Sequence, residues 1–384
     1  AGAPAGSPAG SPAGSPAAAR YRTVQDVVRT SVGGRDPRLR LSNEFGTSPA
    51  TFDDVEVTVP ATGKDPATGK PAAGKGVSPG PRRVTFGGSG SVTIPPGSDA
   101  LSDPVAGSLP PETTLSVTLH VARGSGPVTG HPFATQPSYL SPPGDYARAG
   151  APAASWHQIG SWFYLDGVVV SAPRQVGTVV TLGDSITDGV GSEMGANANW
   201  PDDLARRLLA LPTGQQMAVA NEGLASNRVT ANGDGPNGGV AGLSAQARFA
   251  QDVLGQPGVT TVILLEGIND IGDGVVNSAR QLIDADKQLI AQAHAAGVRI
   301  LGATLTPFQG AGYYSPAKNR IRERVNAWIR TSGAFDGVID FDRAVRDPAD
   351  PARFAPIDDS GDHTHPSDVG YQAMADAVNL ALLR

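Results

Sequence analysis

The chain has 384 residues, of which 49 are glycine and 33 are proline, and only 39% are hydrophobic. This composition excludes an all-helical protein, while enough aliphatic residues remain to exclude a fully disordered one. The net charge of −6 without a basic cluster disfavours nucleic-acid binding, and the lack of cysteine excludes disulfides, a thiol nucleophile and a cysteine zinc site.

Two segments are predicted to be of low complexity. Residues 1–20 form a leader of alanine, glycine, serine and proline, and residues 61–76 repeat ATGK and AAGK between prolines. Such segments bury too little apolar surface to offset the entropy lost on ordering. The leader is typical of linkers exposed after export, so we expect a secreted protein, although no signal-peptide pattern occurs. No apolar run reaches the roughly 18 residues that span a bilayer.

Residues 21–172 are predicted to form an all-β domain. Polar and apolar residues alternate with period two, which is typical of strands with one buried face. Such strands are predicted at 38–41, 55–59, 84–86, 91–94 and 115–121. Because no helical pattern lies between them, we expect a β-sandwich, jelly-roll-like in type, with a long loop at 122–160.

Residues 173–384 follow a different pattern, in which apolar strands alternate with amphipathic helices. The strands are predicted at 176–182, 217–220, 260–265, 299–305 and 338–341, and the helices at 201–211, 278–296, 316–330 and 366–383. This alternation predicts a five-stranded parallel sheet between two helical layers, an α/β fold. Catalytic loops then gather at the carboxyl edge of the sheet.

Small polar motifs follow the first three of these strands. They read Gly183-Asp184-Ser185, then Asn221-Glu222-Gly223, then Gly267-Ile268-Asn269-Asp270, and a fourth motif, Asp362-His363-Thr364-His365, precedes the last helix. A serine hydroxyl needs a base to become a nucleophile, and a carboxylate can orient that base. The four motifs therefore indicate a site for nucleophilic catalysis at the sheet edge.

These four blocks, in this order, resemble the GDSL family of esterases, also called SGNH hydrolases. The resemblance covers residues 176–384 and implies a flavodoxin-like three-layer fold and the hydrolysis of carboxylic esters. It implies that Ser185 is the nucleophile, His365 the general base and Asp362 its orienting partner. It also implies an oxyanion hole formed by the backbone N–H groups of Ser185 and Gly223 and by the side chain of Asn269.

The other polar residues of these motifs have structural interpretations. We expect Asp184 to organise its loop and Asp270 to bridge neighbouring loops. His363 and His365 suggest a metal site, but a triad needs His365 free, so we expect neither a metal nor an organic cofactor. The family spacing selects His365 over His363 as the base.

Four aromatic residues are candidates for the substrate pocket. Trp200 opens a predicted amphipathic helix, where packing is the favoured role. Tyr313 and Tyr314 follow the fourth strand on the active edge. His131 lies in the predicted loop at 122–160, and it is either a surface histidine or a residue that reaches the site.

The predicted activity is that of a serine esterase on small-molecule or carbohydrate esters with short acyl chains. Deacetylation of carbohydrates and hydrolysis of short-chain or aryl esters are ranked together, above lipid hydrolysis. Two alternatives stay open, an acyltransferase using the same acyl-serine and a carbohydrate-binding protein with an inert hydrolase domain. Around residues 30–46 the chain also resembles the β-domain that precedes some bacterial GDSL hydrolases. Two roles stay open for this domain, a scaffold that packs against the hydrolase domain and a carbohydrate-binding module.

Overall fold

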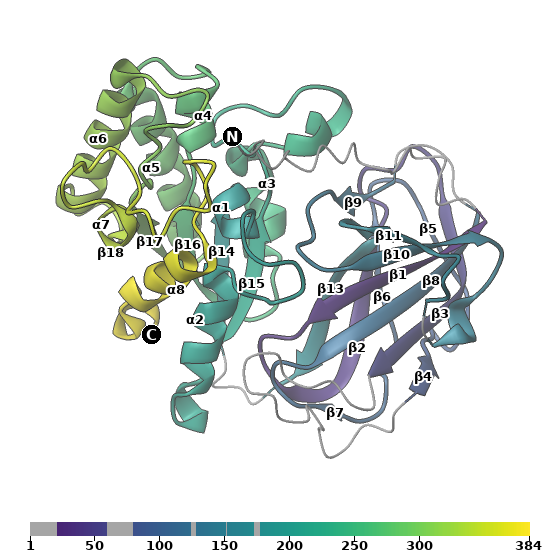
Figure 1. Cartoon of the computed structure of the whole chain (residues 1–384). Helices are drawn as coiled ribbons and strands as arrows, with labels where there is room; N and C mark the ends of the chain where they lie inside the picture. The colour runs from purple at the N-terminus through teal and green to yellow at the C-terminus, as the bar shows by residue number, and fades with distance from the viewer. Residues whose placement is uncertain (1–20, 60–79, 124–127, 151, 173–176) are drawn as a thin grey trace.

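The computed structural model describes residues 21–59, 80–123, 128–150, 152–172 and 177–384. The predicted low-complexity segments at 1–20 and 61–76 lie outside the described residues. The described chain forms a β-domain followed by an α/β domain, side by side (Figure 1). No helix in these ranges is both long enough and apolar enough to cross a membrane.

The β-domain consists of two larger antiparallel sheets with one core between them and a third sheet of two short strands. Its strands are β1 (Arg22–Arg29), β2 (Gly34–Ser42), β3 (Ala50–Val59), β4 (Gly80–Arg83), β5 (Val92–Ile94), β6 (Asp99–Leu101), β7 (Ser108–Leu109), β8 (Thr114–Arg123), β9 (Gly130–His131), β10 (Ser138–Pro143), β11 (His157–Ile159), β12 (Trp162–Phe163) and β13 (Leu165–Ser171). The largest sheet runs β11-β10-β1-β8-β3-β4 with β5 beside β3, the second runs β13-β2-β6 with β7 beside β2, and the third pairs β12 with β9. Alternate residues of β8, namely Leu115, Val117 and Leu119, are buried in the shared core, as period two predicts.

Two expectations for the β-domain were wrong. Residues 84–86 form no strand, because only the isolated bridge of Phe86 with Ser89 occurs there. The stretch 122–160, predicted as a loop, contains β9, β10 and β11. Strand β10 includes two prolines and two serines, a composition that hides its pairing with β1.

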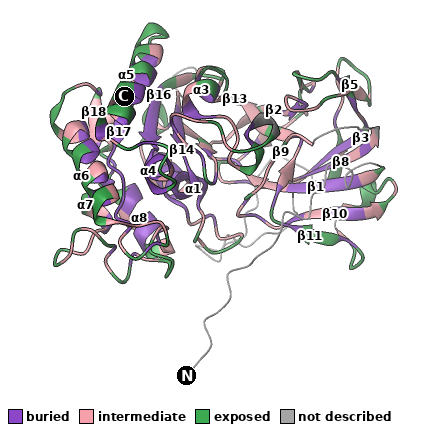
Figure 2. Ribbon diagram, turned by 90° about the horizontal axis from the view of Figure 1, so that it is seen from above, coloured by how far each residue is buried: buried purple, intermediate pink, exposed green. Residues whose placement is uncertain are grey.

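The α/β domain contains a parallel sheet of five strands, as predicted. They are β14 (Thr178–Gly183), β15 (Ala218–Gly223), β16 (Val259–Leu265), β17 (Arg299–Ala303) and β18 (Gly337–Ile339), in the order β15-β14-β16-β17-β18. This is the order of flavodoxin-like folds. The inner strands β14 and β16 are buried, as their continuous apolar runs require (Figure 2).

The helices form two groups. They are α1 (Ser185–Asp188), α2 (Trp200–Leu209), α3 (Ala245–Phe249), α4 (Ile268–Gly272), α5 (Ala279–Ala295), α6 (Pro316–Thr331), α7 (Phe341–Val345) and α8 (Asp368–Ala377). Helix α8 packs against α2 and α7, while α5 packs against α3 and α6. The last helix is shorter than the predicted 366–383, because Ser367 caps it at its start and a separate 3-10 turn forms at Leu380–Leu383.

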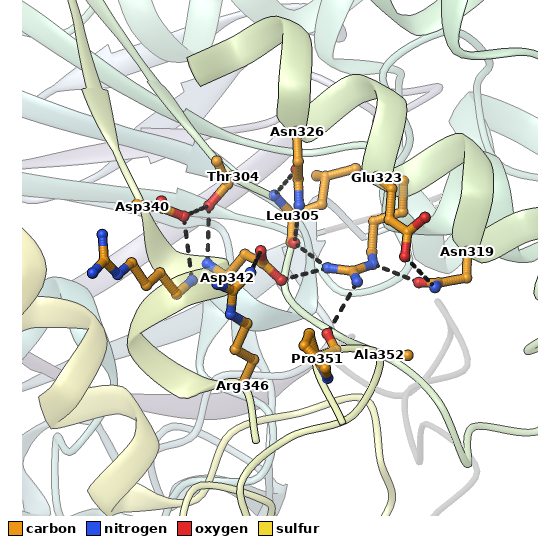
Figure 3. Close-up of polar contacts among 12 residues, drawn as sticks. Thr304, Leu305, Asn319, Glu323, Asn326, Asp340, Asp342, Arg346, Pro351 and Ala352 are labelled. Carbon is orange, nitrogen blue, oxygen red and sulfur yellow. Dashed lines mark hydrogen bonds and ion pairs between the residues drawn. The ribbon is translucent and has the colours of Figure 1, made fainter. Parts of the chain in front are cut away.

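A buried ion-pair network supports the segment that leads to the last motif. Asp342, which is 3% exposed, accepts hydrogen bonds from Arg322 at 2.6 Å and from Arg330 at 2.6 Å (Figure 3). Arg322 also donates to the carbonyls of Leu305 and Pro351. The network thereby joins the loop after β17 to the chain that precedes the motif at 362–365.

The β-domain contacts the edge strand of the parallel sheet. The Ser31 hydroxyl donates to the carbonyl of Val219 on β15 at 2.7 Å and accepts the N–H of the same residue at 3.0 Å. One side chain of the β-domain thus satisfies both backbone groups of Val219 at the exposed edge of the sheet.

A second contact between the domains lies just after α1. The Gly195 N–H donates to the Thr135 carbonyl at 2.9 Å. The Gln136 side chain donates to the Asn197 side chain at 2.6 Å, and both residues are buried. The two domains are therefore joined beside the first motif.

Candidate active site

Ser185 lies where the strand order of the parallel sheet reverses. β14 has β15 on one side and β16 on the other, and open α/β sheets bind ligands at the carboxyl edge beside such a point. The chain turns sharply there, since a side chain at Gly183 would lie 2.1 Å from the Thr187 hydroxyl oxygen. The Asp184 carboxylate then caps α1 by accepting the Ile186 N–H at 2.9 Å. Ser185 is thus the first residue of α1.

Three side chains form a hydrogen-bonded series at this point. The Ser185 Oγ lies 2.8 Å from the His365 Nε2, and the His365 Nδ1 lies 2.5 Å from the Asp362 Oδ2. Ser185 is 7% exposed, while the Asp362 side chain is half exposed. The series has the geometry of a nucleophile, a base and a carboxylate that orients the base.

Asp362 is fixed by its own turn. Its Oδ1 accepts the backbone N–H groups of Thr364 at 2.9 Å and His365 at 2.8 Å. Partial burial opposes ionisation of the carboxyl, but the hydrogen bond and charge of His365 outweigh it and hold the pKa of Asp362 well below its usual range. Asp362 is therefore an ionised hydrogen-bond acceptor for the imidazole.

His363 belongs to a second His–Asp pair. Its Nδ1 lies 2.6 Å from the Asp359 Oδ2, and its ring packs over Gly310, where an added Cβ would lie 2.6 Å from the His363 Cγ. The imidazole is thus bound within its own loop, whereas His365 contacts Ser185. Among the residues that the structure describes, no group of three His, Cys, Asp or Glu side chains could hold a metal ion.

Two of the three predicted oxyanion donors have a free N–H. No acceptor of the Ser185 backbone N–H occurs in the described part of the chain. Asn269, on α4, uses its amide nitrogen to donate to the Asn227 carbonyl at 2.9 Å, and that nitrogen carries a second hydrogen. Both donors follow neighbouring strands, β14 and β16, at the same sheet edge.

Gly223 has a different environment from the one predicted. Its N–H donates to the Asn221 Oδ1 at 2.9 Å. A side chain at Gly223 would lie 2.1 Å from the Asp188 backbone nitrogen, so glycine is needed for β15 to approach α1. These contacts give Gly223 a packing role, and its N–H already has an acceptor.

The loop after Gly223 is bound to α4. Asp270 accepts the N–H groups of Val229 at 2.8 Å and Thr230 at 3.0 Å, which confirms that it bridges neighbouring loops. Ser226 within this loop has a positive φ of 64°. The sequence shows no signal for this backbone conformation, because serine rarely adopts it.

Arg248, on α3, is a further residue that sequence reasoning missed. It is 6% exposed and donates to the Gly183 carbonyl at 3.0 Å, the Glu222 carbonyl at 2.8 Å and the Asn227 Oδ1 at 3.0 Å. It therefore joins the carboxyl ends of β14 and β15 to the loop of Ser226.

Acidic groups lie buried around the site. Burial raises the pKa of Asp184 to about 7, and burial together with Asp270 raises the pKa of Asp286 to about 8. Burial and the nearby Asp184 also raise the pKa of Glu266. Asp184 thus organises its loop from a buried position, by capping α1.

The aromatic candidates have different surroundings. Trp200 is fully buried and its ring centroid lies 5.1 Å from that of Phe341, which agrees with the packing role that the sequence favours. Tyr313 stacks on Phe308 with ring centroids 5.8 Å apart. Tyr314 contacts the same ring from its edge, at 5.2 Å. Both tyrosines are therefore held within the loop after β17.

His131 is not a simple surface residue. Its Nε2 lies 2.9 Å from the Asp188 Oδ1, on the helix that begins with Ser185. His131 therefore contacts the helix of Ser185 at its far end, and a place for His131 in the site stays a prediction.

The chain matches a family model and several solved structures. The model of the GDSL-like Lipase/Acylhydrolase family matches residues 181–373. No curated protein matches the chain. The aryl esterase of M. smegmatis is 16% identical, with 53% of this chain and 96% of that chain covered and a TM-score of 0.42. An acetylxylan esterase from Geobacillus stearothermophilus is 19% identical, with 53% and 94% covered and a TM-score of 0.40.

Proposed function

Because the chain belongs to the GDSL-like lipase/acylhydrolase family, we propose that it hydrolyses short-chain carboxylic esters through an acyl intermediate on Ser185. The observation that carries this proposal is the hydrogen-bonded series from Ser185 through His365 to Asp362. An inert domain would not need all three groups in contact. The family match makes the chain an ester hydrolase in class.

The first half of the reaction forms the acyl-enzyme. The His365 Nε2 takes the proton of the Ser185 hydroxyl as the oxygen attacks the ester carbonyl carbon. Asp362 stabilises the imidazolium that results. The carbonyl oxygen becomes an oxyanion, to which the Ser185 N–H and the Asn269 amide donate. When the tetrahedral intermediate collapses, His365 returns the proton to the leaving alcohol.

Water completes the cycle. His365 removes a proton from a water molecule, which attacks the acyl carbon, and the collapse of the second tetrahedral intermediate returns the proton to the Ser185 oxygen. The carboxylic acid is released and the free hydroxyl is restored. An alcohol in place of water would give the acyltransferase that the sequence leaves open.

The polarity around Ser185 supports a short acyl group. The Asn269 side chain, at the same sheet edge, is polar, while Ile186 and Ile268 are buried in the core. Burial of each CH₂ group contributes about 0.8 kcal/mol only where apolar surface receives it. In polar surroundings a long acyl chain gains little binding free energy from its additional CH₂ groups. We therefore expect acetyl and similarly short acyl groups to be preferred. Export of the protein stays a prediction.

A panel of esters tests this function. Acetylated sugars, aryl acetates and p-nitrophenyl esters of increasing acyl length are compared by kcat/KM. We expect the acetyl esters to be turned over fastest and the value to fall as the acyl chain lengthens. Products are analysed with and without an added alcohol. Rising rates with long chains would contradict the short-acyl proposal, and transfer to the alcohol in preference to water would establish the acyltransferase instead.

A further inference from the structure

His131 brings the β-domain into contact with the helix of the nucleophile. Its Nε2 lies 2.9 Å from the Asp188 Oδ1 and 3.1 Å from the Phe133 carbonyl oxygen. Since both partners are acceptors, the Nε2 carries a hydrogen and donates. Asp188 is the last residue of α1, the helix whose first residue is Ser185. One residue of the β-domain thus contacts the short helix that begins with the nucleophile.

Asp188 also binds the loop after β15. Its second oxygen, Oδ2, accepts the Ala225 N–H at 3.2 Å. The residue is 5% exposed, and its carboxylate is therefore shared between His131 and Ala225 away from most solvent. Loss of one donor leaves a buried carboxylate oxygen without a hydrogen bond, which costs free energy. Loss of the His131 bond is therefore expected to shift Asp188 and with it the bond to Ala225.

Ser226 lies between two fixed points of this loop. Ala225 before it is bound to Asp188, and the carbonyl of Asn227 after it accepts the Asn269 amide at 2.9 Å. No acceptor of the Ser226 N–H occurs among the described residues, and the side chain is exposed. A serine persists at a φ of 64° only where its surroundings impose it. Ser226 therefore carries a free N–H in a backbone conformation that is fixed on one side through Ala225 and on the other through Asn227, the residue that binds the Asn269 amide.

We infer that His131 is a positioning residue of the esterase, which acts through Asp188 to hold the Ser226 N–H as the third oxyanion donor. This inference rests on the proposed function. The β-domain then takes part in the reaction. Ser226 takes the place of Gly223 as the third donor, because the Gly223 N–H already donates to Asn221. A donor must already be in place when the oxyanion forms, since its value lies in its fixed orientation.

The surroundings of His131 favour such a role. Its ring lies 5.4 Å from that of Trp162, which donates to the Val27 carbonyl at 2.8 Å and so belongs to the β-domain. The following residues Thr135 and Gln136 bind the chain after α1. His131 is therefore held by the β-domain on one side and by the contacts around α1 on the other.

Three histidine variants test the inference with a short p-nitrophenyl ester. His131→Ala removes the donor to Asp188, and kcat is expected to fall about 10- to 100-fold with little change in KM, because misplacement affects the transition state most. His131→Gln retains a side-chain N–H donor and is expected to restore most of kcat. His120→Ala is the matched control, because His120 forms a similar pair with Asp53 at 2.6 Å elsewhere in the β-domain. It is expected to leave kcat unchanged.

A backbone substitution keeps the inference testable if His131→Ala fails to fold. Replacement of the residue-226 amide by an ester removes only the N–H donor, and kcat is expected to fall about 10²-fold. The same replacement at residue 223 is expected to cost much less. Normal kcat in folded His131→Ala, or a larger loss at 223 than at 226, would overturn the inference. Ser185→Ala separates the two proposals, since activity in that variant contradicts the esterase mechanism itself.

Discussion

Ser185→Ala is expected to lower kcat by about 10⁴-fold or more while the protein stays folded. The Ser185 Oγ lies 2.8 Å from the His365 Nε2, so the imidazole can accept the hydroxyl proton while the oxygen attacks a carbonyl carbon. Within the described residues, no other hydroxyl contacts a histidine of the site. Alanine removes one oxygen atom from a small side chain, so the packing of α1 is retained. Steady-state turnover of a short p-nitrophenyl ester measures the loss, and the thermal unfolding midpoint checks the fold.

Ser360→Ala is the matched control for this variant. Ser360 lies in the loop of the last motif, where its backbone N–H donates to the His365 carbonyl at 3.0 Å. Alanine preserves that bond, so near-normal turnover is expected. Equal activity of the two alanine variants would show that Ser185 is not the nucleophile.

His365→Ala is expected to cause a loss of the same order as Ser185→Ala, and His363→Ala a far smaller one. Both imidazoles bind an aspartate through Nδ1, at 2.5 Å to Asp362 and at 2.6 Å to Asp359. Only the His365 Nε2 also reaches the Ser185 Oγ, among the histidines that the structure describes. The base is therefore assigned by geometry, where the sequence could use only spacing.

The two histidine variants serve as controls for each other. They have the same change in the same loop, so a general disturbance of the loop lowers both activities together. Steady-state kcat values of the two variants, with unfolding midpoints, distinguish these effects. A greater loss in His363→Ala than in His365→Ala would mean that the base is wrongly assigned.

The strands with regular patterns could be predicted from the sequence. The alternation in 115–121 and the apolar run before Gly183 correspond to β8 and β14. Strand β10 could not be predicted, because its residues SYLSPP lack periodicity and it is stabilised by pairing with β1. Tertiary contacts also shorten the last helix, since Pro366 pairs with Asp359 in a bridge and the helix begins only at Asp368.

The site residues that lie in family motifs could be predicted from the sequence. The residues that are positioned by contacts with distant parts of the chain could not. Ser185 and His365 are separated by 180 positions, yet family motifs identify each one. Nothing near His131 in the sequence indicates that it contacts Asp188 in the other domain. Ser226 gives no signal either, because a positive φ at serine is imposed by its neighbours.

Covalent labelling of the protein tests whether Ser185 carries the activated hydroxyl. The protein is incubated with a fluorophosphonate, which reacts with activated serine hydroxyls, and is then digested for peptide mass spectrometry. We expect one label per chain on Ser185, loss of ester turnover in step with labelling, and no label in His365→Ala on the same timescale. A label on another residue, or full turnover after Ser185 is labelled, would contradict it.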